Sequence, residues 1–169
     1  MKEMIEITEA MLVDFIDGKL SAEEFRSIVL AGSREGAVEA DVDEAMSHIL
    51  VGIDPYKVDL LKRLSEKYEL YMLSNNNPIC LPHAVRMFEE AGFSMKTDFR
   101  KCYMSFEMKA LKPSAAFYKA VVADIGLPAE DMLFIDDSRL NVEGAVAAGL
   151  PAVYYEPGSD LSALLAEGL

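Results

Sequence analysis

From residue 54 onward, short apolar segments alternate with helical segments, and this alternation restricts the fold more than any other feature of the sequence. The apolar segments cover residues 69–74, 101–105, 132–136 and 152–155. Strands that alternate with helices along a chain form a parallel sheet with helices on both faces. The sequence therefore predicts an α/β core with a doubly wound parallel sheet over residues 54–169.

The first 53 residues have a different character, with helical periodicity and no strand pattern. Ser21 and Glu24 form a capping-box pattern that predicts the start of the second of three helices. Asp54 and Pro55 predict the start of the first core helix. We therefore expect a small helical domain over residues 1–53, ahead of the core over residues 54–169.

The composition excludes several classes of partner. The 169-residue chain has a net charge of −13, which repels a nucleic-acid backbone. No apolar run is long enough to span a bilayer, and the charged N-terminus does not resemble a signal peptide. Cys80 and Cys102 form neither a disulfide framework nor a metal-binding pattern. We expect a cytoplasmic protein with no nucleic-acid or membrane partner.

Polar residues follow three of the predicted strands. They are Ser74, Ser105 and the pair Asp136-Asp137. In an open parallel sheet, ligands bind outside the carboxyl ends of the strands. These side chains are therefore the candidates for chemistry.

The adjacent carboxylates of Asp136 and Asp137 make a hard oxygen site that suits Mg²⁺. A second interpretation is that Asp137 or Ser138 only caps the next helix. Asn141, one helical turn later, can hold the carboxylates by hydrogen bonds. Its position favours the metal site slightly.

Ser74 and Lys112 are candidates for binding a phosphoryl group. Ser74, followed by Asn75 and two further asparagines, can present a hydroxyl and backbone N–H groups, although such a segment also fits a simple turn. Lys112 precedes a proline that predicts a helix start, and its charge can offset that of a phosphate. A solvated lysine is the alternative, and Lys109 competes for the same role.

The order of these signals is more specific than each one alone. A strand-end Ser-Asn, a Lys-Pro before a helix and a strand-end Asp-Asp resemble motifs two, three and four of the haloacid dehalogenase-like (HAD) superfamily. The segment IDGKLSAEEF (residues 16–25) resembles the helical cap that one subgroup inserts between motifs one and two. The segments YMLSNN and LFIDD are similar to those of sugar-phosphatase-like members. The resemblance implies a HAD-like Rossmannoid sheet with a small helical cap.

The resemblance also implies a reaction: Mg²⁺-dependent hydrolysis of a small phosphorylated metabolite, such as a sugar phosphate, through an aspartyl-phosphate. Ser74 would bind a phosphoryl oxygen, and Lys112 would pair with the nucleophile and the phosphate. Asp136 would bind Mg²⁺ directly, with Asp137 in direct or water-mediated support. Asn75 and Asn141 would be supporting residues.

Motif one of the family, a strand followed by Asp-x-Asp, is the part that the sequence does not match. The segment MLVDFIDG (residues 11–18) places Asp14 and Asp17 one residue too far apart and on a helical pattern, so neither is the expected nucleophile. We expect the central first strand to be missing, about 25–35 residues with its helix. The 169-residue chain alone is then predicted to be inactive. A homodimer or a swapped assembly that fills the missing strand is also expected.

Two other functions remain open. A non-catalytic protein that binds phosphate or metal fits the missing nucleophile. A 2-haloacid dehalogenase shares the fold, but its chemistry needs no metal, so the Asp136-Asp137 pair argues against it.

Overall fold

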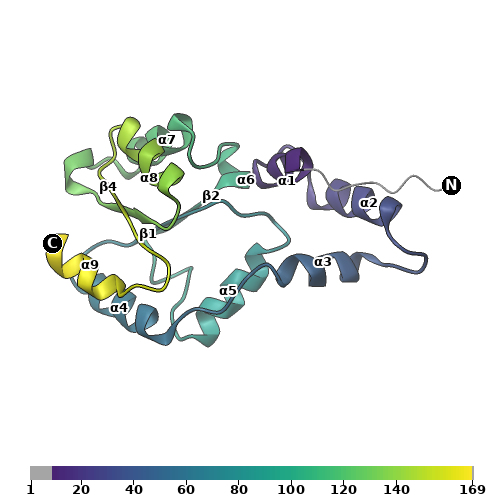
Figure 1. The fold of residues 1–169 in the computed structure, drawn as a ribbon, viewed down its shortest axis with the longest axis horizontal. Helices are drawn as coiled ribbons and strands as arrows, with labels where there is room; N and C mark the ends of the chain where they lie inside the picture. The colour runs from purple at the N-terminus through teal and green to yellow at the C-terminus, as the bar shows by residue number, and fades with distance from the viewer. Residues whose placement is uncertain (1–8, 169) are drawn as a thin grey trace. The chain divides into compact units, whose positions relative to one another are not determined.

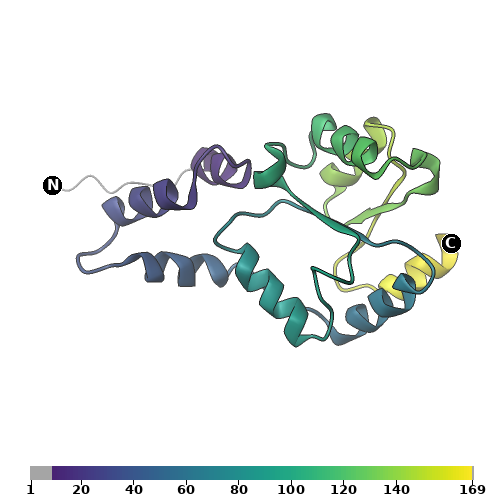
Figure 2. The ribbon, with the colours of Figure 1, turned by 180° about the vertical axis from the view of Figure 1, so that it is seen from behind.

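The computed structural model describes residues 9–168 of the chain. It divides into two compact units, Met1–Lys109 (unit 1) and Ala110–Leu169 (unit 2), each of which contains helices and strands (Figures 1 and 2). The predicted division into a cap over residues 1–53 and a core over residues 54–169 stays a prediction.

The described part of unit 1 begins with helices and continues with alternating helices and strands (Figure 1). The N-terminal helices are α1 (Glu9–Ile16), α2 (Ala22–Gly32) and α3 (Glu39–Ser47). The alternating part comprises α4 (Pro55–Ser65), β1 (Tyr71–Ser74), α5 (Leu81–Glu90), β2 (Lys101–Met104) and α6 (Ser105–Met108).

Unit 2 alternates throughout. It comprises α7 (Ala115–Ile125), a short 3-10 turn η1 (Ala129–Asp131), β3 (Phe134–Asp136), α8 (Arg139–Ala147), β4 (Ala152–Tyr154) and α9 (Leu161–Gly168). The predicted α/β class is confirmed.

The N-terminal helices are fixed by caps and by an aromatic core. The predicted capping box is present: the Ser21 N–H donates to Glu24 at 2.8 Å, and the Glu24 N–H donates to the Ser21 hydroxyl at 3.2 Å. The buried rings of Phe15 and Phe25 stack with centroids 4.1 Å apart, so α1 and α2 share one core. Ile79, from the loop after β1, belongs to the same cluster. The helices therefore pack against the segment that follows the carboxyl end of β1.

The sequence pattern predicts a third N-terminal helix that starts near Asp41 or Asp43 and runs to Leu50, and the observed helix begins earlier. The Val38 N–H donates to the Asp41 carboxylate at 2.9 Å, so Asp41 lies in the first turn rather than before it. The helix consequently starts at Glu39 and ends at Ser47, short of the predicted Leu50. The four-residue α6 was also not predicted.

The strands form two separate parallel pairs. β1 pairs with β2 from Tyr71 opposite Lys101 to Ser74 opposite Met104, and β3 pairs with β4. The prediction of one four-stranded sheet is therefore wrong for the described residues. The expectation that Ser74 and Asp136 share one sheet edge stays untested, because they belong to different units.

Within the described residues, no helix combines the length and the apolar character needed to cross a membrane.

Candidate functional site

Unit 2 contains a buried ion pair between Lys112 and Asp136. The Lys112 Nζ lies 2.6 Å from Asp136 Oδ2, and the two side chains are only 9% and 7% exposed. The ammonium group also lies 5.5 Å from the centre of the Phe134 ring. An alternative interpretation of Lys112, a solvated lysine before a turn, is wrong because the side chain is buried.

The other oxygen of Asp136 is held by two donors. Oδ1 accepts a hydrogen bond from the Ser138 N–H at 2.9 Å and another from the Asn141 side-chain amide at 2.9 Å. The predicted contact between Asn141 and the strand-end carboxylates is thus present for Asp136. With three donors around it, this carboxylate is fixed in position at the end of β3.

Two further residues shape this cluster, and the sequence analysis missed both. The Tyr118 hydroxyl donates to the Asn141 carbonyl at 2.7 Å, and burial, with a smaller contribution from the charge of Asp136, raises the pKa of Tyr118. Gly144 lets α8 approach the Lys112-Pro113 segment, because a Cβ there would lie 2.4 Å from the Pro113 carbonyl oxygen. An isolated glycine in a helical pattern was the available signal for this close approach.

Asp137 differs from its neighbour because its side chain is exposed. Ser138 caps α8, since its hydroxyl accepts from the Asn141 N–H at 3.4 Å. Ser138 is therefore the residue that caps α8, and Asp137 does not cap it. Asp136 and Asp137 together offer two carboxylates at the end of β3.

This donor set fits Mg²⁺ in part. Mg²⁺ prefers oxygen ligands and is commonly held by one or two carboxylates together with waters and substrate oxygens. Among residues 9–168, no group of three or more His, Cys, Asp or Glu side chains is placed to hold a metal ion by itself. Asp136 and Asp137 can therefore supply two ligands, and further oxygen ligands must come from elsewhere.

In unit 1, Ser74 is the last residue of β1 and is half-buried. The asparagines that follow it build a tight turn: Asn76 Oδ1 accepts from the Asn77 N–H at 2.8 Å, and Asn77 Oδ1 accepts from the Cys80 N–H at 2.9 Å. Asn75, by contrast, is exposed. The turn interpretation is thus correct for Asn76 and Asn77, and the turn fixes the segment next to Ser74.

Ser105 is not a free strand-end hydroxyl but a fully buried link. Its hydroxyl donates to the Ile16 carbonyl at 2.6 Å and accepts from the Asn76 N–H at 3.1 Å. Lys109, the competitor of Lys112, instead donates to the Gly18 carbonyl. Ser105 therefore connects the end of α1 to the strand ends of unit 1, and Lys109 connects it to the end of α6.

The acidic residues that might replace motif one have other contacts. Asp14 and Asp17 both pair with Lys19, at 3.4 and 2.8 Å. The sequence contains one Asp-x-Asp, Asp41-Val-Asp43, and it lies within α3. Asp43 forms a bidentate pair with Arg26, at 2.7 and 2.9 Å. Among the described residues, no Asp-x-Asp directly follows a strand.

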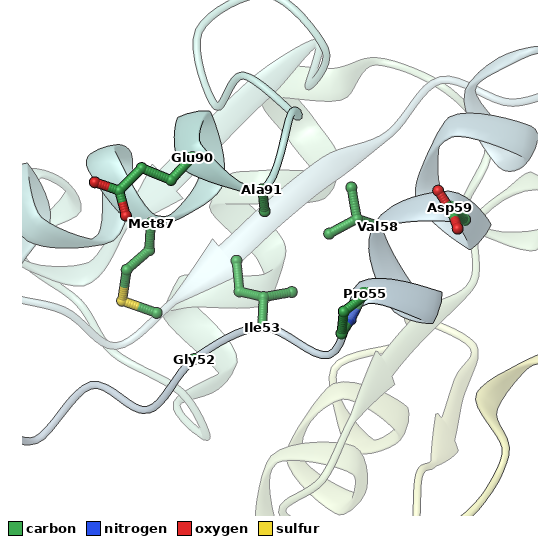
Figure 3. Close-up of a pocket in the computed structure, with 8 residues that line it drawn as sticks. All are labelled: Gly52, Ile53, Pro55, Val58, Asp59, Met87, Glu90 and Ala91. Carbon is green, nitrogen blue, oxygen red and sulfur yellow. The ribbon is translucent and has the colours of Figure 1, made fainter.

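Unit 1 also contains two hollows, the second of which is lined in part by Asp41. The first, of about 460 Å³, lies between the start of α4 and the end of α5 and is shown in Figure 3. The second, of about 420 Å³, lies between α2 and α3. Neither is lined by a residue that the sequence analysis selected for chemistry.

Comparison with known proteins gives a consistent family. A model of the haloacid dehalogenase-like hydrolases matches residues 5–149. The chain is 29% identical over 147 residues to D-ribitol-5-phosphate phosphatase of Bacteroides thetaiotaomicron, covering 85% of this chain and 70% of that protein.

Solved structures agree with this match. A HAD family enzyme of Bacteroides thetaiotaomicron, solved in complex with magnesium and inorganic phosphate, superposes with a TM-score of 0.82 at 34% identity, over 89% of this chain and 77% of that one. A HAD-like hydrolase of Porphyromonas gingivalis superposes with a TM-score of 0.82 at 30% identity, over 98% and 81%. The chain belongs to the haloacid dehalogenase-like hydrolase family, as its motifs implied.

Proposed function

We propose that the chain carries the lysine, metal-binding and phosphate-binding parts of a Mg²⁺-dependent phosphomonoesterase for small phosphorylated metabolites. Sugar phosphates and sugar-alcohol phosphates are the first candidates, since a relative is named a D-ribitol-5-phosphate phosphatase. The observation that carries the proposal is the buried Lys112–Asp136 pair at 2.6 Å. A buried ion pair is a poor stabiliser compared with apolar residues of similar volume, so such a pair points to function.

Lys112 and Asp136 divide the work in this proposal. Asp136 holds the ammonium group in one place, supported by Asn141 and the Ser138 N–H. The ammonium group then neutralises charge on the phosphoryl oxygens and on the attacking carboxylate as bonds to phosphorus form and break. Ser74, with Asn75 beside it, donates hydrogen bonds to a phosphoryl oxygen.

Mg²⁺, when bound, offsets the negative charge between substrate and carboxylates. The oxygens of Asp137 are more available to a metal ion, because Asp137 is exposed, whereas both oxygens of Asp136 already accept hydrogen bonds. We therefore assign Asp137 a larger share of the metal contact than the sequence analysis did. Asp136 keeps a share through its remaining lone pairs.

The nucleophile is the part that the described residues do not supply. Asp14 lies in α1 and Asp17 directly follows it, both pair with Lys19, and Asp41 and Asp43 lie in α3. A phosphoryl transfer through aspartyl-phosphate therefore needs a strand that ends in Asp-x-Asp.

Phosphate release from sugar phosphates and an aryl phosphate, measured with Mg²⁺, tests the proposal. The 169-residue chain should show negligible release. The same chain extended at its N-terminus by a strand ending in Asp-x-Asp should turn over, and Asp136→Ala in that extended chain should abolish turnover. Mg²⁺-dependent release by the unextended chain that is lost in Asp14→Ala or Asp17→Ala would contradict the assignment of the nucleophile.

A non-catalytic protein that binds phosphate or metal is the second candidate. The observation in its favour is that the aspartates that could replace motif one already have other partners: Asp41 and Asp43 at α3, and Asp14 and Asp17 with Lys19. Phosphate binding by the unextended chain, with no turnover by the extended one, would favour it. Self-association through strand edges and a cytoplasmic location stay predictions, and light scattering tests the first.

A further inference from the structure

Asp17 is an acidic side chain that the proposed reaction does not use. It lies directly after α1, and its side chain is 10% exposed. Its Oδ2 pairs with Lys19 Nζ at 2.8 Å, but its Oδ1 is buried with no hydrogen-bond partner in the described structure. No other buried side-chain oxygen or nitrogen of the described residues lacks a partner.

The backbone on both sides of Asp17 is held by side chains, from the end of β2 on one side and from the end of α6 on the other. The carbonyl before it, of Ile16, accepts from the Ser105 hydroxyl, which also receives the Asn76 N–H. The carbonyl after it, of Gly18, accepts from Lys109. Asn76 lies two residues beyond Ser74, and Ser105 follows β2 directly. Asp17 is therefore held at the edge of the β1–β2 sheet where ligands of parallel sheets bind.

The approach of α1 to α6 is close enough to require a glycine. A Cβ at Gly18, which has a φ of +69°, would lie 2.2 Å from the Phe106 carbonyl oxygen. α1 and α6 lie side by side in Figures 1 and 2. The position of Asp17 is thus fixed by backbone contacts and not by its own carboxylate.

An unpartnered buried oxygen lowers stability, because it loses its bonds to water without replacement. The pairing with Lys19 does not account for burying it, since the half-exposed Asp14 contacts the same ammonium group from 3.4 Å. Residues that break a local rule of stability are found at sites of function. Asp17 therefore has the properties of a residue that binds a ligand.

We propose that Asp17 Oδ1 accepts a hydrogen bond from a hydroxyl group on the part of the substrate that carries no phosphate. The proposal rests on the proposed function and names its substrate class, polyhydroxylated organic phosphates. A carboxylate repels phosphate, so it contacts the other end of the substrate. Lys19 already neutralises its charge, which suits a neutral hydroxyl better than a second cation. Asp17 thus determines specificity, while Ser74 binds the phosphate.

Titration calorimetry of the full chain with Mg²⁺ tests this with two probes, D-ribitol 5-phosphate and inorganic phosphate. The polyol phosphate should bind more tightly than phosphate. Asp17→Leu should weaken the polyol phosphate by about tenfold or more and leave inorganic phosphate unchanged. Asp17→Asn, which keeps an acceptor oxygen, should restore part of the loss. Asp14→Leu is the matched control and should bind both probes as the parent does.

Urea unfolding of the same variants separates a ligand contact from a structural one. The unfolding midpoint of Asp17→Leu should equal or exceed that of the parent, because the substitution removes a buried unpaired oxygen. A midpoint lowered well beyond that of Asp14→Leu would overturn the proposal, as would equal affinities for the two probes or an unchanged polyol affinity in Asp17→Leu. If the parent chain does not bind inorganic phosphate while polyol-phosphate binding still depends on Asp17, the result contradicts the proposed function and not the role of Asp17.

Discussion

Unit 1 and unit 2 each bury an aspartate beside a lysine, but the two carboxylates differ in how completely they are bonded. Asp136 in unit 2 receives hydrogen bonds from Lys112, Ser138 and Asn141 on its two oxygens. Asp17 in unit 1 pairs with Lys19 through one oxygen and leaves the other unpartnered. Both oxygens of Asp136 accept hydrogen bonds, whereas one oxygen of Asp17 can accept a further hydrogen bond.

The difference separates two kinds of specificity. In the proposed function, a fully bonded carboxylate fixes the lysine that every phosphate ester would meet, so it would serve the step that all such substrates share. A carboxylate with an unpartnered buried oxygen would, as proposed above, discriminate between substrates by the groups that they carry, because an unmatched buried polar group is costly. The comparison predicts opposite effects of substitution in the two units.

The largest expected effect is on the ion pair of unit 2. Lys112→Met leaves the Asp136 carboxylate buried without its counter-charge, and the free energy of unfolding should fall by about 3–5 kcal/mol. Urea unfolding measures the change. Lys119→Met, on the exposed face of α7, is the control and should change stability by less than about 0.5 kcal/mol. Equal, small changes in both variants would remove the contrast between the units.

The next effect concerns the contact that positions Asp17. Gly18→Ala and Gly36→Ala both place a side chain at a positive φ, which costs about 1–2 kcal/mol. Only at Gly18 does the added Cβ also collide with backbone, at Phe106, which should cost about 1–3 kcal/mol more. The difference in unfolding free energy between the Gly18→Ala and Gly36→Ala variants measures the cost of this collision. If the two variants unfold alike, α1 is not held against α6 in the way described.

A smaller effect is expected from the partner of Asp136 Oδ1. Asn141→Ala removes one of the two donors to that oxygen, and the free energy of unfolding should fall by about 1–3 kcal/mol. Glu143→Ala, exposed on the same helix, controls for changes in helix propensity. An Asn141→Ala protein as stable as Glu143→Ala would show that Asp136 does not depend on this bond.

The smallest effect is on pH dependence. Burial, with a lesser contribution from Glu107, raises the pKa of Cys102 in unit 1 to about 11. Since the unfolded thiol loses its proton at a lower pH than the folded one, its contribution to stability is complete below about pH 8.5 and is lost as pH rises towards about 11. The fall in unfolding free energy between about pH 8 and about pH 10 should therefore be smaller in Cys102→Ser than in the parent. An equal fall in both would show that Cys102 is not the group involved.

The sequence predicted the positions of helices and strands better than it predicted which strands pair with each other. Ser21-Ala-Glu-Glu predicted the start of α2 because a capping box is encoded within four residues. Lys112, Asp136 and Asn141 were selected because motif order identifies them, but the ion pair between Lys112 and Asp136 was not predicted. The separation of the strands into two pairs was not predicted, since pairing depends on distances that no local pattern fixes. The links through Ser105, Tyr118 and Gly144 were missed for the same reason: each joins segments that lie apart in the sequence.

The central claim is that the Lys112–Asp136 pair is kept for phosphate binding and not for stability. The affinity for inorganic phosphate of the double variant Lys112→Met/Asp136→Leu tests it most directly. Replacing a buried ion pair by apolar residues of similar size is commonly neutral or stabilising, so the double variant should fold at least as stably as the parent. We predict that this folded variant has lost phosphate binding. A folded double variant that binds phosphate as the parent does would contradict the account.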